Sequence, residues 1–303
     1  IYTLWHTLSL HDALPISLEK KELKVRLLKG SHLVVKSETI PVSHAVSFVH
    51  PEDSRFVFII PWEGTILLGT TDIEYTERLS EAPSITKEEC RYILEGVRYV
   101  FPSLNISPEC FLSSFSGLRT VFSKEEKDPS KESREHFIWA DKGLISVAGG
   151  KLTTFRRLAW DILKAAEDFL PEGVCVDEDA PVFTPVSELS GSETGISEKV
   201  LRRLTGWYGT SAGNIIGEAS SEDLTAIPGT HYLWAELRHA ACNEQVRHLS
   251  DLLLRRLRIG LITPYGGKHL FKRIRETCSN VLGWNPERWE TERTESMRLI
   301  STK

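Results

Sequence analysis

Two adjacent glycines and a lysine, Gly149 to Lys151, join an apolar run to a basic, helix-like stretch in the sequence SVAGGKLTTFRRLA. The apolar run LISVA predicts a strand, and the periodicity after Gly150 predicts a helix that starts near Lys151. Paired glycines allow a ligand to approach the backbone, while a helix start offers unpaired N–H groups and the positive end of its dipole. Together with the hydroxyls of Thr153 and Thr154, this junction suits an anion or an electron-rich heteroatom. A plain change of chain direction would use the same residue types.

Two arginines add to the capacity for binding an anion. Arg119 lies in the apolar run FSGLRTVF, where a guanidinium is costly unless it meets an anion or a carboxylate. Arg134, in PSKESREHF, lies where a charged stretch returns to strand-like sequence. Because a guanidinium can bind phosphate through two parallel hydrogen bonds, the pair indicates a phosphorylated or carboxylated ligand. The alternatives are a structural ion pair for Arg119 and a solvated loop charge for Arg134.

One histidine is a candidate for proton transfer. His32 follows Gly30 and Ser31 at the start of an apolar run, and histidine side chains titrate near neutral pH. A hydrogen-bonded structural histidine is the alternative. Glu244 and His248 have the spacing of one helical face, but no third ligand accompanies them, so we expect no metal site.

Strand-like segments surround these residues. The runs LKGSHLVV, HAVSFVH, FVFIIPW, TILLGTTD and ECFLSSFSGLRTVF predict strands, with a hairpin turn at Gly64. Thr86 and Glu89 have capping-box spacing before a helical period that ends at Pro102. HFIWADKGLISVAGG predicts two further strands around a tight turn, and SKEEKDPSKESRE a charged surface loop. A mixed sheet with one clear helix therefore precedes the glycine turn.

The remaining chain is helical in pattern. We expect a sheet domain with its strand–turn–helix over residues 18–170, a linker over 171–195 and a small all-α domain over 196–303. Residues 1–17 lack the order of a signal peptide, and we expect a non-native or disordered leader there. The fold class predicted is therefore α+β, a mixed β-sheet domain followed by a helical C-terminal domain.

Composition limits the kinds of partner. The net charge of -5 argues against a nucleic-acid-binding protein. The five cysteines have no metal-binding spacing and favour a reducing, cytoplasmic compartment. No run reaches the length that a membrane-spanning helix needs, so membrane contact would be peripheral. The basic cluster Arg255, Arg256 and Arg258 would suit an anionic membrane surface or a set of ion pairs. Association into a homo-oligomer stays open.

The order and spacing of several motifs resemble the FAD-dependent glycerol-3-phosphate dehydrogenases. The motifs are KGSHLVV, FVFIIPWEGTILLGTTD, FSGLRTVF, PSKESREHFI, GLISVAGGKLTTFRRLA and LLLRRLRIGL. The resemblance is strong from Leu23 to Leu170 and looser over the helical part. GGKLTTFR after a strand is its most specific element.

The resemblance implies roles for particular residues. Gly149, Gly150, Leu152 and Thr153 would contact FAD, and Lys151, Arg119 and Arg134 would hold the phosphate of glycerol 3-phosphate. His32 would act as acid or base near the substrate hydroxyls, with Arg119 close to the reacting carbon. The implied reaction oxidises C2 of sn-glycerol 3-phosphate to give dihydroxyacetone phosphate, and electrons pass through the flavin to a quinone.

One feature of the family is absent from this sequence. Members begin with a GxGxxG dinucleotide fingerprint, and no GxGxxG occurs here. We therefore expect a truncated chain that is inactive alone and does not hold FAD tightly. A glycerophosphate oxidase, with oxygen as acceptor, is a second interpretation, although no insertion lies between Arg134 and Gly149. A different flavoprotein oxidase and a non-catalytic phosphate-binding fragment are the others.

Overall fold

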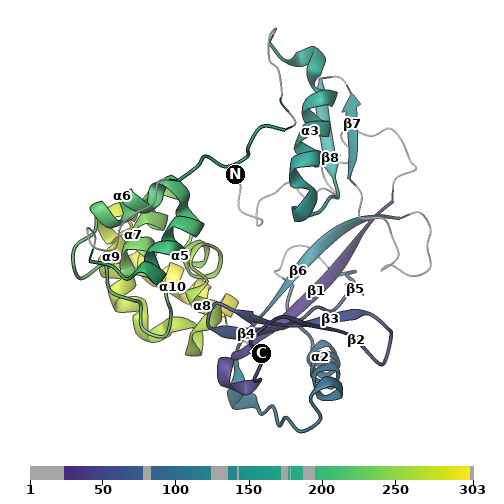
Figure 1. The fold of residues 1–303 in the computed structure, drawn as a ribbon, viewed down its shortest axis with the longest axis horizontal. Helices are drawn as coiled ribbons and strands as arrows, with labels where there is room; N and C mark the ends of the chain where they lie inside the picture. Colours follow the sequence, from purple (N-terminus) through teal and green to yellow (C-terminus); the bar gives the residue numbers. More distant parts are fainter. Residues whose placement is uncertain are drawn as a thin grey trace. The chain divides into compact units, whose positions relative to one another are not determined.

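The computed structural model of the chain describes residues 24–77, 83–123, 136–141, 143–171, 177, 179–186 and 195–300 (Figure 1). The chain divides into two compact units. The first comprises residues 1–31, 71–84 and 116–180, and the second comprises residues 32–70, 85–115 and 181–303. Strands β1 and β6 contribute residues to both units.

A six-stranded sheet carries three of the six sequence motifs, KGSHLVV, FVFIIPWEGTILLGTTD and FSGLRTVF (Figure 1). Its strands are β1 (Lys24–Lys36), β2 (Val46–Val49), β3 (Phe56–Trp62), β4 (Thr65–Gly69), β5 (Ile73–Glu74) and β6 (Phe111–Ser123). The order is β2-β3-β4-β1-β5, and β6 also pairs with β1. Antiparallel registers set His32 of β1 opposite Gly69, and Leu28 of the same strand opposite Glu74. The strands predicted from the sequence are confirmed, and the short β5 was not anticipated.

Alternation of side chains along the strands gives the sheet its apolar core in the second unit. Val57 and Ile59 of β3 are buried, whereas the alternating Phe56 and Phe58 are exposed. This period of two turns every second side chain toward helix α2 (Lys87–Val100). The core consists of Leu33, Val35, Ile40, Ile59, Ile66, Leu68, Ile93, Val97 and Ile106.

Helix α2 begins with the capping box that the sequence predicts. The Thr86 hydroxyl accepts from the Glu89 backbone N–H at 3.2 Å, and the Glu89 carboxylate accepts from the Thr86 N–H at 2.9 Å. These two bonds satisfy N–H groups that a helix start otherwise leaves unpaired. The helix ends at Val100, ahead of Pro102, as expected.

The turn between β3 and β4 is tight and strained. Glu63 and Gly64 have φ angles of 52° and 78°, and the flanking Trp62 and Thr65 form the last pair of the ladder. Two left-handed residues match the twist of the strands, as in a type I′ hairpin. Glycine accepts that conformation freely, whereas for Glu63 it costs on the order of 1 kcal/mol.

A separate two-stranded sheet precedes the glycine turn in the first unit. Strands β7 (Phe137–Asp141) and β8 (Leu144–Ala148) are antiparallel, as predicted. The prediction of a helix from Lys151 is wrong in its start, because a 3₁₀ turn spans Leu152–Thr154 and α3 spans Phe155–Ala165. The Thr154 N–H and hydroxyl both bond the carbonyl oxygen of Lys151, at 3.0 Å and 3.2 Å. Such local bonds by a threonine compete with α-helix.

The C-terminal part of the second unit is helical, as predicted. Its helices are α5 (Glu198–Tyr208), α6 (Ala212–Gly217), α7 (Trp234–Asn243), α8 (Ile259–Ile262), α9 (Phe271–Leu282) and α10 (Pro286–Ile300), with a π-helix at Asp251–Arg256. The long helix-periodic stretch 231–261 is broken after Asn243, where Gln245 adopts a left-handed φ of 52°. The buried Asp251 carboxylate accepts from the N–H groups of Arg247 and His248 and so begins the next helical segment.

Candidate functional site

The glycine turn after β8 depends on the backbone freedom of its two glycines. Gly149 and Gly150 have φ angles of 82° and 88°, which residues with a Cβ rarely adopt. A Cβ on Gly150 would also lie 3.2 Å from Leu158 of α3. Beyond the glycines, the chain exposes Lys151, the hydroxyl-bearing Thr153 and Leu152, whose side chain is 88% exposed. The turn therefore presents a cation, a hydroxyl and apolar surface together.

A partly exposed hydrogen bond ties helix α3 to the two-stranded sheet. Asp161 of α3 accepts from His136 Nε2 at 2.8 Å, immediately before β7, and from Arg157 Nε. The Cβ of His136 also lies near Gly150, since a Cβ built on the glycine would lie 3.7 Å from it. These contacts fix the direction in which the chain leaves the turn.

Arg119 on β6 lies beside a carboxylate, as in the structural ion pair that was one interpretation of this arginine. Its guanidinium lies 3.3 Å from Asp72 Oδ1 and donates to the Thr71 carbonyl oxygen at 2.9 Å. One third of the arginine side chain is exposed, while Asp72 is only 10% exposed. The arginine is thus oriented by the segment between β4 and β5 and still reaches solvent.

A small polar cluster continues from Arg119 into the sheet. The Ser31 N–H donates to Thr71 Oγ1 at 2.9 Å, and the hydroxyls of Ser31 and Ser116 are 2.7 Å apart. Ser31 and Thr71 are buried, so these hydroxyls are held in fixed positions within an otherwise apolar sheet. Sequence reasoning missed Ser31, Thr71 and Asp72, although the motif GTTD contains two of them.

His32 follows Ser31 on β1 and lies in the second unit. Its ring stacks on Phe115 with centroids 4.9 Å apart and an angle of 14° between the planes. Phe115 in turn lies 6.3 Å from the ring of Trp62. The histidine is held by aromatic packing on one side.

The predicted site residues therefore fall into separate surroundings. The contacts of the glycine turn lie within β7, β8 and α3, those of Arg119 lie around Asp72, and His32 packs on Phe115. Arg134 and most of the predicted charged loop lie outside the described residues.

The basic cluster of the helical part is engaged in ion pairs. Arg255 lies 3.1 Å from Asp251, Arg256 lies 3.6 Å from Glu244, and Arg258 lies 3.5 Å from Glu63. These contacts favour the ion-pair interpretation of the cluster over a membrane surface. No helix in the described part of the chain is both long and apolar enough to pass through a bilayer. The described part of the chain also holds no group of three His, Cys, Asp or Glu side chains that could bind a metal ion.

Two family models divide the chain between them. The model of FAD dependent oxidoreductases matches residues 5–156, which is half of the chain. The chain belongs to this family of FAD-dependent oxidoreductases. The model of the C-terminal domain of alpha-glycerophosphate oxidase matches residues 156–289 of the chain. The sheet and the helical part thus correspond to two domains of known flavoproteins.

Two similar proteins share the name aerobic glycerol-3-phosphate dehydrogenase. The aerobic glycerol-3-phosphate dehydrogenase of Bacillus subtilis (strain 168) is 34% identical over 250 residues, which are 75% of this chain and 45% of that protein. The enzyme of the same name from Staphylococcus aureus (strain USA300) is 32% identical over 254 residues, 77% of this chain and 45% of that protein. The chain spans about half the length of these curated relatives.

A solved structure agrees with the fold. The glycerol-3-phosphate dehydrogenase from Bacillus halodurans, complexed with FAD, has a TM-score of 0.73 and 25% identity. The match covers 96% of this chain and 61% of that one. The resemblance to glycerol-3-phosphate dehydrogenases and the fold class, both expected from the sequence, are confirmed.

Proposed function

We propose that this chain supplies the substrate-binding sheet and a flavin-covering turn for FAD-dependent oxidation of sn-glycerol 3-phosphate. The product is dihydroxyacetone phosphate. The observation that carries the proposal is the Arg119 guanidinium, oriented by Asp72 and Thr71. The names of the relatives support the substrate.

The phosphate needs cations that are held in place before the substrate arrives. The Asp72 carboxylate and the Thr71 carbonyl fix one side of the Arg119 guanidinium, while the partly exposed remainder can meet phosphate oxygens. Lys151 adds an exposed charge, and Arg134 is the third cation of the proposal. Preorganised cations bind the dianion without first reorienting, which reduces the cost of binding.

Oxidation at C2 breaks one C–H and one O–H bond. Bound FAD supplies the acceptor for the hydride that leaves C2. We assign the hydroxyl proton to the imidazole of His32, because an imidazole nitrogen can accept a proton from a bound hydroxyl. Stacking on Phe115 restricts the ring to one plane and so limits the directions in which it can receive the proton.

The glycine turn fits a flavin by its chemistry. Its two left-handed glycines bring bare backbone to the surface, next to the Thr153 hydroxyl and the strongly exposed Leu152. A flavin ring system has apolar faces and a polar, hydrogen-bonding edge, which match these two kinds of surface. Gly149, Gly150, Leu152 and Thr153 are the residues that would hold it.

The 303-residue chain lacks the GxGxxG fingerprint, so we propose that it does not retain FAD tightly alone. Absorbance of bound flavin after desalting measures this property. Retention of one FAD per chain after desalting would contradict this part of the proposal and would leave the other parts unaffected.

Substrate-dependent reduction tests the function itself. The FAD-loaded protein that contains this chain is mixed anaerobically with glycerol 3-phosphate, and the flavin absorbance is followed. We expect glycerol 3-phosphate to bleach the flavin and glycerol, which lacks the phosphate, to leave it oxidised at the same concentration. Equal bleaching by both compounds would contradict a phosphate-directed site.

The electron acceptor separates two candidate functions. We propose a quinone, which lies in a bilayer, so the protein would approach the inner face of the cell membrane from the cytoplasm. The match of residues 156–289 to the C-terminal domain of alpha-glycerophosphate oxidase favours oxygen as the second candidate. Reoxidation by a soluble quinone without hydrogen peroxide supports the first. Rapid reoxidation by oxygen with stoichiometric peroxide supports the second.

A further inference from the structure

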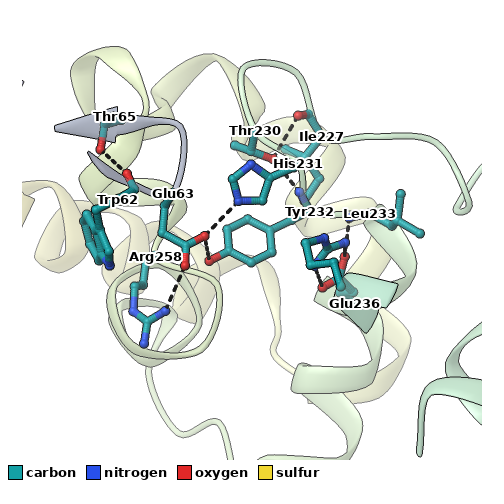
Figure 2. Close-up of polar contacts among 11 residues, drawn as sticks. Trp62, Glu63, Thr65, Ile227, Thr230, His231, Tyr232, Leu233, Glu236 and Arg258 are labelled. Atoms are coloured by element: carbon teal, nitrogen blue, oxygen red, sulfur yellow. Dashed lines mark hydrogen bonds and ion pairs between the residues drawn. The ribbon is translucent and has the colours of Figure 1, made fainter. Parts of the chain in front are cut away.

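Glu63, at the tip of the β3–β4 hairpin, joins the sheet to the helical part of the second unit (Figure 2). Its Oε2 accepts from the hydroxyl of Tyr232 and from His231 Nε2, each at 2.9 Å. Its Oε1 lies 3.5 Å from a guanidinium nitrogen of Arg258. The carboxylate is only 11% exposed. One side chain of the hairpin is thus bound by three residues that follow it by more than 160 positions.

Arg258 connects this carboxylate to two tryptophans. Its guanidinium lies 5.8 Å from the ring centre of Trp62 and 5.1 Å from that of Trp207. Cation–π contacts of this kind are strongest where solvent is largely excluded. The arginine therefore ties Trp62, next to Glu63 in the hairpin, to a tryptophan of helix α5.

The partners of Glu63 are themselves fixed. Tyr232 is fully buried, with Trp207 edge-on at 5.9 Å and Arg203 over its ring at 5.7 Å. Arg203 makes two hydrogen bonds of 2.7 Å and 2.6 Å to the buried carboxylate of Glu236. The two hydrogen bonds to Glu236 hold the Arg203 guanidinium over the Tyr232 ring, and Trp207 packs on the edge of that ring. Glu63 therefore accepts a hydrogen bond from a tyrosine whose ring is itself fixed by its neighbours.

Two aromatic contacts connect the same hairpin to His32. Trp62 lies 6.3 Å from Phe115, and Phe115 stacks on His32 at 4.9 Å. The strand that carries Phe115 has its own link to the helical part, because Ser113 donates to the carbonyl oxygen of Leu261 at 2.7 Å. Side chains in contact at this density transmit small displacements to their neighbours.

We propose that Glu63 and Arg258 are positioning residues that set the ring plane of His32 through Trp62 and Phe115. The role of that ring in proton transfer rests on the proposed function, whereas the positioning itself does not. Loss of the Glu63 charge would leave Arg258 without its counter-ion between the two tryptophans. Trp62 would then shift, and the stacked pair of Phe115 and His32 would shift with it.

The test follows the His32 ring directly in the 303-residue chain, without flavin. Histidine rings are labelled with ¹³C, the signals of the ten histidines are recorded by NMR, and His32→Gln identifies the signal of His32. Because the ring stacks on Phe115, its proton shifts depend on the distance and tilt between the two rings. We expect Glu63→Gln and Arg258→Lys each to move the His32 signal by several line widths.

A matched carboxylate variant serves as the control. Glu290→Gln removes a charge that pairs with Arg293 on the exposed face of α10, and we expect it to leave the His32 signal in place. Tyr232→Phe removes one hydroxyl from the Glu63 cluster and decides the question if the other two variants do not fold. An unmoved His32 signal in folded Glu63 or Tyr232 variants would overturn the proposal.

The outcome is separable from that of the proposed function. In the FAD-loaded enzyme, we expect Glu63→Gln to lower kcat for glycerol 3-phosphate with little change in KM, since the phosphate ligands stay in place. If His32→Gln has full activity while Glu63→Gln still moves the His32 signal, the catalytic role of His32 fails and the positioning stands. If the signal does not move, the positioning fails whatever the activity.

Discussion

The guanidinium of Arg119 lies 3.3 Å from the carboxylate of Asp72 and donates to the neighbouring carbonyl oxygen of Thr71. Asp72 is mostly buried, whereas a third of the arginine side chain is exposed. The carboxylate therefore has the arginine as a partner, and part of the arginine side chain reaches solvent. This is the arrangement expected of a cation that is oriented by the protein to bind an anion.

Substitution of Asp72 tests whether that orientation matters for the substrate. Asp72→Asn keeps the shape of the side chain and removes its charge, so we expect the KM for glycerol 3-phosphate to rise about tenfold, or about 1.4 kcal/mol. Glu74→Gln is the control, because Glu74 makes the same kind of pair with Arg26 at a more exposed position of the sheet. Steady-state kinetics measure both variants. Equal KM values in the two variants would show that Asp72 has no special part.

Two helical glycines should respond in opposite directions to alanine. A Cβ on Gly96 of α2 would lie 2.7 Å from the ring of His50 and 3.0 Å from Phe48, so Gly96→Ala should destabilise the chain by about 1–3 kcal/mol. A Cβ on Gly206 of α5 meets nothing within 4 Å, and Gly206→Ala should stabilise it by about 0.5–1 kcal/mol. Thermal unfolding of both variants provides the measurement. A Gly96→Ala variant as stable as the parent would contradict the close packing of α2 on the sheet.

Alkaline pH should weaken the fold through Tyr232. Burial, followed by the nearby Glu63 carboxylate and the hydrogen bond to it, raises the pKa of Tyr232 above its ordinary value near 10. The unfolded chain then loses the proton first, so this contribution to stability is complete below about pH 10 and declines as the pH rises further. Tyr232→Phe should flatten the decline by up to about 1.4 kcal/mol per pH unit.

Urea unfolding midpoints on either side of about pH 10 measure that slope. Tyr99→Phe, at a ring that is 65% exposed, is the control and should keep the slope of the parent. The account of the Glu63 cluster would fail if Tyr232→Phe and Tyr99→Phe had the same slope.

Local features of the fold were accessible to sequence reasoning. The β-branched and aromatic residues of the run FVFIIPW predicted a strand, and β3 spans Phe56–Trp62. The spacing of Thr86 and Glu89 predicted a helix start, and both hydrogen bonds of the capping box are present. These predictions hold because each depends on residues within a few positions of one another.

Contacts between distant residues were not accessible in the same way. The bond from Tyr232 to Glu63 spans 169 positions, and that from Arg119 to Thr71 spans 48. No period or spacing encodes them, since they depend on how the strands and helices pack. The start of α3 was misjudged for a different reason, because the hydroxyl of Thr154 closes a local turn that competes with the helix.

Turnover of glycerol 3-phosphate by the FAD-loaded Arg119→Ala variant tests the central claim most directly. Arg26→Ala is the matched control, since Arg26 also pairs with a carboxylate on this sheet, at 2.7 Å from Glu74. We predict that kcat/KM falls about 100-fold or more in Arg119→Ala, equivalent to about 2.7 kcal/mol, and by less than about twofold in Arg26→Ala. Equal kcat/KM values in the two variants would contradict the assignment of Arg119 to the substrate phosphate.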